Sequence, residues 1–304
     1  MTIKNQLQVI LKQTALTQEQ LARLLSVSFA TLNSWVNGKS NPRAKAVTRI
    51  EELYNRSTGE KTLSPKELEK KYRTLLLKKK FHKNILSFIL KRPDLYDTFM
   101  LQLTYNTNRI EGSTLTEDET ASLLFDNRVL PNKTLVEQLE AKNHQTALKA
   151  VFKNLRTQKI TEEWILKLHA MLLNGIREDA GCYRNHGVRI LGTFVPTANH
   201  LKVPQLMKEL VKKINKKEKN PLRHAAFVHA VFEKIHPFSD GNGRIGRLIL
   251  HAMLLKTNFP PALIREENRR LYYTYLKKAQ LEEDYSLLED FLMGAVDESL
   301  ELLD

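Results

Sequence analysis

The chain has 304 residues, 42% of them hydrophobic, and its 48 Lys and Arg residues against 34 Asp and Glu give a formal net charge of +14, so there is room for two domains with packed cores. The single cysteine, Cys182, excludes an internal disulfide framework, and no apolar run approaches the roughly 18 residues of a membrane span. With no apolar signal-peptide segment at its start, the sequence predicts a cytoplasmic protein without membrane contact.

The N-terminal residues predict two short helices joined by a tight turn. Thr17 is expected to cap the first helix, and Gln20 occupies the capping-box position three residues later. The second helix is expected to run from Phe29 to Val36 and to end at Asn37-Gly38. This spacing is typical of a helix-turn-helix.

These elements, with Asn41-Pro42 after them, resemble the Cro/phage-repressor family, whose second helix enters the major groove of DNA. The resemblance implies a DNA-binding-like domain over residues 1–56, although Ser26 stands where the family usually has glycine. The residues that it would bring to bases are Ser28, Phe29, Ala30, Asn33 and Ser34, and those near phosphates are Lys39, Arg43 and Lys45. The alternative is a helical module of the same shape that binds protein.

Residues 57–93 predict a linker and then a basic connecting helix, from about 65 to 91. The segment Ser64-Pro65-Lys66-Glu67 supplies an N-cap, a proline at the first helical position and a capping-box glutamate. Residues 1–93 hold 19 basic and 6 acidic residues, almost the whole positive excess of the chain. Such a charge attracts nucleic-acid phosphates without regard to sequence. The alternative for its lysine runs is a solvated helix face.

Leucine-rich helical periodicity predicts a mainly α domain over residues 94–304, with one short exception. A helix is expected at about 103–112, where Thr107 and Glu111 lie four residues apart on one face. At about 186–197 apolar and polar residues alternate, so a short β-hairpin is predicted there.

Residues 236–247 are the most informative segment, reading His-Pro-Phe-Ser-Asp-Gly-Asn-Gly-Arg-Ile-Gly-Arg. His236 can take a proton near neutral pH, and Asp240 offers a hard oxygen ligand for Mg²⁺. The turn Gly241-Asn242-Gly243 leaves backbone N–H groups for an anion. The apolar run that follows predicts a helix, so the two arginines lie at the helix end that favours phosphate.

At every fixed position, this segment resembles the signature of the Fic family, His-x-Phe-x-Asp/Glu-Gly-Asn-Gly-Arg-x-x-Arg. The family's usual activity is transfer of AMP from ATP to a hydroxyl side chain of a target protein. The resemblance implies that His236 is the base acting on that hydroxyl and that Asp240 holds Mg²⁺. It also implies phosphate contacts from Gly241, Asn242, Gly243, Arg244 and Arg247. A branch that phosphorylates has lysine where this chain has Gly243, which favours AMP transfer here.

Other segments extend the resemblance. The predicted hairpin at 186–197 corresponds to the family's flap, which binds an extended piece of the target by strand addition. Ala180-Gly181-Cys182-Tyr183-Arg184 is similar to a family Gly-x-aromatic-Arg step. Tyr272 and Tyr273 resemble a segment near the adenine, although tyrosine pairs on helices are more often core residues.

Residues 107–112, Thr-Asn-Arg-Ile-Glu-Gly, resemble the family's inhibitory motif, Ser/Thr-x-x-x-Glu-Gly/Asn. The resemblance implies that Glu111 pairs with Arg247 and blocks productive seating of the γ-phosphate, with Thr107 helping to position it. The alternative is that Glu111 is a solvated charge at a helix end.

We therefore interpret the chain as an autoinhibited protein adenylyltransferase that uses ATP and Mg²⁺. One alternative is a DNA-binding transcriptional regulator whose Fic domain senses nucleotide. Another is removal of AMP by the same site, with Glu111 orienting a water molecule. Because both resembled families often pair, a homodimer is a further expectation.

Overall fold

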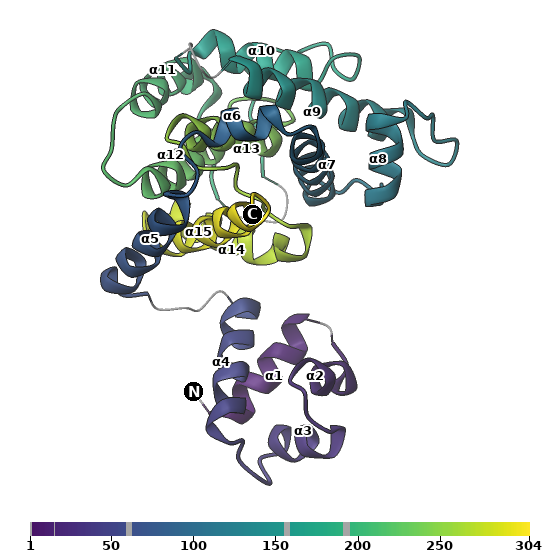
Figure 1. Ribbon diagram of the computed structural model, residues 1–304, viewed down its shortest axis with the longest axis vertical. Helices are drawn as coiled ribbons and strands as arrows, with labels where there is room; N and C mark the ends of the chain where they lie inside the picture. Colours follow the sequence, from purple (N-terminus) through teal and green to yellow (C-terminus); the bar gives the residue numbers. More distant parts are fainter. Residues whose placement is uncertain (1, 15, 59–62, 155–158, 191–194) are drawn as a thin grey trace. The chain divides into compact units, whose positions relative to one another are not determined.

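The chain folds into helices, and the computed structural model describes residues 2–14, 16–58, 63–154, 159–190 and 195–304 (Figure 1). It divides into two compact units, Met1–Leu63 with Arg270–Tyr275, and Ser64–Arg269 with Leu276–Asp304. Within these described residues, no helix is both long and apolar enough to cross a membrane.

The N-terminal bundle of the first unit contains α1 (Ile3–Thr14), α2 (Gln18–Leu24), α3 (Phe29–Val36) and α4 (Ala44–Thr58). Thr17 caps α2 in a full capping box with Gln20, and Ser28 caps α3. Burial of apolar side chains from all four helices stabilises the bundle. Its core includes Leu7, Ile10, Leu21, Leu32, Trp35 and Ile50.

The turn between α2 and α3 places a non-glycine residue in left-handed backbone, because Ser26 has φ 56°. That conformation costs an L-residue roughly 1–2 kcal/mol, and glycine avoids the cost but gains freedom in the unfolded chain. We expect Ser26→Gly to raise the free energy of unfolding of this bundle by about 0.5–1 kcal/mol. Urea unfolding followed by Trp35 fluorescence, in a Trp164→Phe background, measures the change. Ser26→Ala is the matched control, and equal stability of the two variants would contradict the argument.

The second unit contains α5 (Pro65–Lys79), α6 (Ile85–Lys91), α7 (Pro93–Ile110), α8 (Glu117–Phe125), α9 (Leu135–Asn154), α10 (Glu162–Leu172), α11 (Val203–Ile214), α12 (Pro221–Ile235), α13 (Asn242–Lys256) and α15 (Ser286–Glu301). Two short 3₁₀ turns, η1 (His200–Lys202) and η2 (Glu266–Asn268), lie between them, and the residues of α14 (Arg269–Glu282) fall in both ranges.

Helix α13 is the central element of this unit. It contacts α7, α9, α10 and α12, and it lies beside α12 (Figure 1). Nearly all of its residues are buried, as expected for a helix that is covered on every side. Because α12 ends just before α13 begins, the loop between them is fixed at both ends by buried helices.

The predicted connecting helix is two helices, α5 and α6. The break is fixed from outside, since the Asn258 side chain accepts a hydrogen bond from the Ile85 N–H at 2.8 Å. Helix α5 packs on α15, where Lys71 Nζ lies 2.7 Å from Asp290 and Lys78 Nζ lies 2.5 Å from Asp297. These lysines therefore pair within the second unit, which reduces the charge left to attract nucleic acid.

The β-hairpin predicted at about 186–197 is wrong. The described residues of this stretch contain no strand, the rest of it lying outside the description. Side chains hold the segment instead: Thr197 Oγ1 donates to the Val188 carbonyl at 2.8 Å, and Arg184 Nη2 donates to the Ala198 carbonyl at 2.5 Å. An isolated two-stranded hairpin is marginal in water because no second layer covers it.

Candidate functional site

The predicted catalytic segment lies at the junction of α12 and α13. His236 is the C-cap of α12 with φ 52°, and Gly241 is the N-cap of α13 with φ 76°. Left-handed backbone suits glycine but costs histidine of the order of 1–2 kcal/mol. Such strain persists only where surrounding contacts hold the residue, and it is frequent at functional sites.

The His236 ring is oriented by its own helix. Its Nδ1 lies 3.2 Å from the carbonyl oxygen of Glu233, so Nδ1 carries the proton and donates. Nε2 is then left as a base. Burial lowers the pKa of His236 below its ordinary value, which keeps the ring neutral at neutral pH. The side chain is 17% exposed, so the base remains in reach of solvent.

Arg184 fixes the backbone around this histidine. Its guanidinium donates from Nε to the His236 carbonyl at 2.7 Å and from Nη2 to the Ala198 carbonyl. Its own N–H donates to the carbonyl of Pro237 at 3.0 Å. A buried guanidinium has several donors that need acceptors, and here they tie the predicted flap segment to the loop.

Asn242 holds the loop closed through both the oxygen and the nitrogen of its side-chain amide. The amide oxygen accepts from the Phe238 N–H at 2.9 Å, and Nδ2 donates to the Phe238 carbonyl at 2.8 Å. The side chain is thus engaged, so a phosphate contact from Asn242 would come from its backbone N–H. The first N–H groups of a helix have no partner within it, and those of α13 begin at this residue.

The structure brings Arg247 together with both residues of the predicted inhibitory motif. Arg247 Nε donates to Thr107 Oγ1 at 2.6 Å, and Nη2 donates to Glu111 Oε1 at 2.5 Å. The arginine side chain is 2% exposed and the glutamate side chain 30%. A Cβ on Gly243 would overlap the Glu111 carboxylate, so this carboxylate lies directly on the first turn of α13.

Arg244 has a partner that the sequence did not suggest. Its Nη1 donates to Glu140 Oε1, on α9, at 2.6 Å. Its Nε is buried and has no hydrogen-bond acceptor among the described residues. Burying a donor without an acceptor is unfavourable, so this atom fits a site that an anion completes.

Asp240 is the candidate ligand for Mg²⁺. Its side chain is 49% exposed, and Oδ1 accepts from the Gly241 N–H at 2.6 Å. The described residues contain no cluster of three or more metal-binding side chains. Mg²⁺ commonly uses one or two carboxylates together with water and substrate phosphates. The donor set therefore fits a Mg–nucleotide complex.

Glu233 is a buried acid behind the loop, and it was missed at the sequence level. Burial raises its pKa to about 8, an effect that Arg247 opposes and Glu111 reinforces. The folded chain thus holds this proton more tightly than the unfolded chain does. Its contribution to stability is complete below pH 4.5, the ordinary pKa, and is lost as pH rises toward about 8.

We expect Glu233→Gln, which stays neutral, to remove this loss of stability. Between about pH 5 and pH 7.5, the free energy of unfolding of the parent should fall with rising pH more steeply than that of the variant. The difference in slope should be roughly 1.4 kcal/mol per pH unit. Urea unfolding at several pH values measures the slope, with the exposed Glu209→Gln as control. Parallel pH profiles for parent and variant would contradict the buried, protonated state of Glu233.

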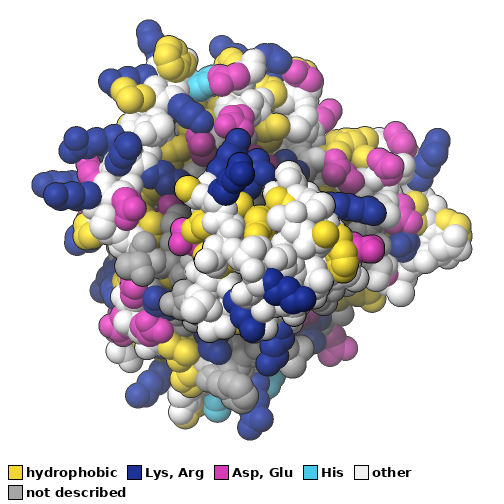
Figure 2. All heavy atoms as spheres, turned by 90° about the horizontal axis from the view of Figure 1, so that it is seen from below, with side chains coloured by type: hydrophobic (Ala, Val, Ile, Leu, Met, Phe, Trp, Pro, Cys, Tyr) yellow, Lys and Arg dark blue, Asp and Glu magenta, His cyan; other side chains and the backbone are white. Residues whose placement is uncertain are grey.

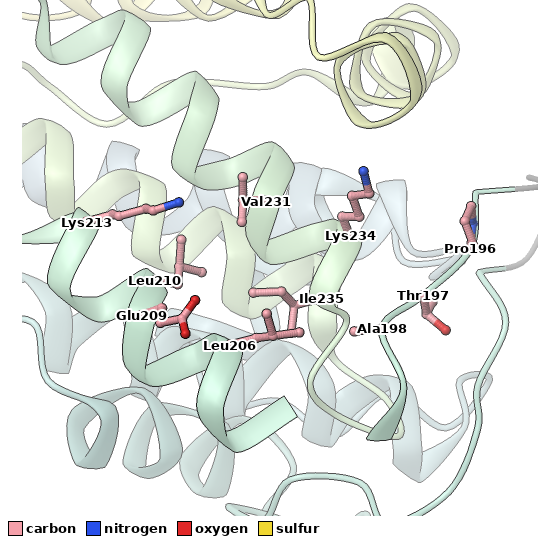
Figure 3. Close-up of a pocket in the computed structure, with 10 residues that line it drawn as sticks. All are labelled: Pro196, Thr197, Ala198, Leu206, Glu209, Leu210, Lys213, Val231, Lys234 and Ile235. Atoms are coloured by element: carbon pink, nitrogen blue, oxygen red, sulfur yellow. The ribbon is translucent and has the colours of Figure 1, made fainter. Parts of the chain in front are cut away.

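A groove of about 390 Å³ adjoins the segment that Arg184 holds (Figure 3). One wall comes from α11, another from the end of α12, and the third from the segment itself. Its floor is mainly apolar, and charged side chains lie among the lining residues. These residues are Pro196, Thr197, Ala198, Leu206, Glu209, Leu210, Lys213, Val231, Lys234 and Ile235.

The predicted DNA-contact residues of the first unit lie on α3 and around it. Phe29 is 49% exposed, and Ala30 and Lys39 are also exposed. Ser28 and Asn33 already bond within the bundle, to the Thr31 N–H and to the Asn37 side chain. The predicted adenine-side residues Tyr272 and Tyr273 have ring centroids 5.2 Å apart, and Tyr272 is fully buried.

Two separate parts of the chain match different families. Residues 159–254 match the Fic/DOC family, and residues 7–61 match the helix-turn-helix family. A structure described as a Fic domain containing signaling protein from Bacteroides thetaiotaomicron VPI-5482 superposes with a TM-score of 0.64 at 26% identity, covering 78% of this chain and 97% of that one.

Relatives named protein adenylyltransferase extend this similarity. Protein adenylyltransferase Fic from Nematostella vectensis is 30% identical over 260 residues, which is 77% of this chain and 59% of that protein. Protein adenylyltransferase fic-1 from Caenorhabditis elegans is 32% identical over 192 residues, 61% of this chain and 37% of that protein. The chain thus spans less than two thirds of either relative. By residues 236–247, its fold and these relatives, this chain contains a domain of the Fic/DOC family.

Proposed function

We propose that the chain is a protein adenylyltransferase held in an inhibited state by Glu111. The observation that carries the proposal is the junction of α12 and α13, where a neutral histidine base stands beside a helix N-terminus bearing two buried arginines. Helix N-termini and arginines bind phosphate groups. The names of the relatives favour AMP as the transferred group.

In this reaction the hydroxyl oxygen of the target attacks the α-phosphorus of ATP. The bond from that phosphorus to the bridging oxygen breaks, pyrophosphate leaves, and the hydroxyl proton passes to His236 Nε2. Phosphoryl-type transfer depends mainly on positioning and charge neutralisation. Arg244, Arg247 and the first N–H groups of α13 bind the phosphate oxygens. Asp240 would hold Mg²⁺, which would supply neutralisation of the phosphate charge.

Glu111 inhibits because it takes the place of a phosphate. Its carboxylate is an anion on Arg247 and lies over Gly243, so a γ-phosphate cannot occupy the same position. The negative charges of the Glu111 carboxylate and of a γ-phosphate would repel each other strongly in a buried site. Transfer of labelled α-phosphate from ATP to protein, with and without Glu111, tests the proposal.

A second activity, DNA binding by the first unit, is favoured by a basic notch beside α3. The notch has a volume of about 440 Å³ and is lined in part by Arg43, Lys45 and Arg49, and none of its described lining residues carries a carboxylate. Figure 2 shows Lys and Arg side chains at many points of one face, interspersed with acidic ones. Because the charges are mixed, the basic cluster in the notch argues for DNA binding more strongly than the net charge of the chain does. Converging cations of this kind suit a phosphate backbone.

We expect Arg43→Ala to weaken DNA binding and to lower the slope of log K against log salt by about 1, whatever the sequence of the fragment. Filter binding of genomic fragments at several salt concentrations measures it. Lys167→Ala, in an exposed position on α10, is the control and should leave the slope unchanged. An unchanged slope in Arg43→Ala would place the DNA elsewhere, and no binding at all would remove the second activity.

A further inference from the structure

His169 makes contacts that link three parts of the candidate site. It lies on α10, it is 1% exposed, and its ring stacks on Phe238 with centroids 3.7 Å apart and planes 8° from parallel. Its Nδ1 accepts from the Gly181 N–H at 2.8 Å. Its Nε2 lies 3.1 Å from the backbone carbonyl of Asp240.

These two bonds fix the tautomer of the ring. A nitrogen that accepts from an N–H carries no proton, so Nδ1 is bare and Nε2 carries the hydrogen. Nε2 then donates to the Asp240 carbonyl. The other neutral tautomer would set two N–H groups against each other at Gly181 and leave that carbonyl without its donor.

The partners of His169 are themselves parts of the site. Gly181 has φ 84°, and a Cβ there would approach Ala170 on α10 to 3.0 Å, so this backbone is pressed against the helix. Three residues later Arg184 binds the His236 carbonyl. The carbonyl of Asp240 belongs to the peptide whose N–H, at Gly241, holds the Asp240 carboxylate.

We propose that His169 is a positioning residue for the Mg–nucleotide site, acting through the peptide between Asp240 and Gly241. Its Nε2–H holds this peptide in one orientation, and the N–H of the same peptide directs the Asp240 carboxylate. Its Nδ1 couples the same ring to the Gly181 backbone. The proposal rests on the proposed function for the identity of the ligand, Mg²⁺ with a nucleoside triphosphate.

Two near-isosteric variants separate the two bonds. The amide nitrogen of Gln can take the place of Nε2, while the amide oxygen of Asn takes the place of Nδ1. His169→Gln thus retains the donor to Asp240, and His169→Asn retains only the acceptor for Gly181. His169→Phe keeps the stacking on Phe238 but lacks both polar atoms.

Calorimetry tests the proposal in the full chain carrying Glu111→Gly, by titrating Mg²⁺ into protein with ATP. Partners that orient a metal ligand are worth at least about tenfold in metal affinity. We expect His169→Asn and His169→Phe to weaken Mg²⁺ binding by about tenfold, and His169→Gln by less than about threefold. Binding of ATP in EDTA should change less than about threefold in all of them.

Equal Mg²⁺ affinity in the Asn and Gln variants would overturn the proposal. A loss of ATP binding in EDTA as large as the loss of Mg²⁺ binding would also overturn it. If the Phe variant fails to fold, the Asn and Gln pair still decides. Long-range proton–nitrogen spectra of the His169 ring give a second readout, expected to show protonated Nε2 and bare Nδ1. None of these readouts depends on turnover. Failure of AMP transfer in Glu111→Gly would therefore reject the proposed function and leave the positioning role of His169 to be decided by these readouts.

Discussion

Glu111→Gly is expected to raise incorporation of labelled AMP into protein by about 100-fold over the parent. In the parent, Arg247 is buried against Glu111. Loss of one member of a buried ion pair changes the free energy by about 3 kcal/mol, which corresponds to a factor of about 100. We take the lower end of the usual range because the Glu111 side chain is 30% exposed. Incubation with α-labelled ATP and Mg²⁺, alone and with cell lysate, measures the incorporation.

Two controls define the cause. Glu111→Gln keeps the size of the side chain and removes its charge, so it should gain most of the activity if repulsion of phosphate is responsible. Glu267→Gln, in an exposed position of η2, should behave as the parent. If Glu111→Gln and the parent label equally while Glu111→Gly is active, the side chain blocks by its bulk, and the charge argument is wrong.

His236→Ala in the Glu111→Gly background is expected to reduce labelling by about 10²–10⁴-fold, the usual contribution of a general base. The Nδ1–H bond to the Glu233 carbonyl leaves Nε2 as the proton acceptor, and alanine removes it. Binding of Mg–ATP should remain, because the arginines and the helix N-terminus are unchanged. Single-turnover labelling and calorimetry measure the two quantities.

The pH dependence of labelling gives an independent check of the same residue. Because burial holds the pKa of His236 below 6.5, its ordinary value, the base is neutral throughout the neutral range. Labelling by Glu111→Gly should therefore be level across neutral pH and should fall only on acidification below that value. His200→Ala serves as control. A loss of activity that begins above neutral pH would show that another group supplies the base.

Local signals in the sequence were enough for much of the structure. Thr17 with Gln20, and Ser64 with Glu67, form the capping boxes that their spacing predicts, because a cap needs only neighbours within one turn. The short loop before α13 follows from its glycines in the same way. The pairing of Glu111 with Arg247 has no such local signal, and only the resemblance to a family suggested it.

What the sequence did not reveal depends on contacts between distant residues. The partner of Arg244 is Glu140, on another helix, and no spacing rule connects them. The break between α5 and α6 is fixed by Asn258. The hairpin was predicted from a short alternation, which does not say whether a third strand or a second layer exists to stabilise it.

His169 shows the same limit at the scale of one side chain. A buried histidine on a helix is most simply a core residue, and the sequence offered no reason to connect it to Asp240. Only the folded chain shows that both ring nitrogens are engaged, one by Gly181 and the other by the loop between α12 and α13.

The most direct test of the account follows the two ends of ATP separately. Glu111→Gly is incubated with ATP labelled at the α-phosphate or at the γ-phosphate, and the protein is counted and weighed by mass spectrometry. The account predicts that the α-label alone reaches protein, with the mass gain of one AMP, and that His236→Ala reduces this labelling by about 10²–10⁴-fold. Transfer of the γ-label, or binding of Mg–ATP with neither label transferred, would contradict AMP transfer as the function of this site.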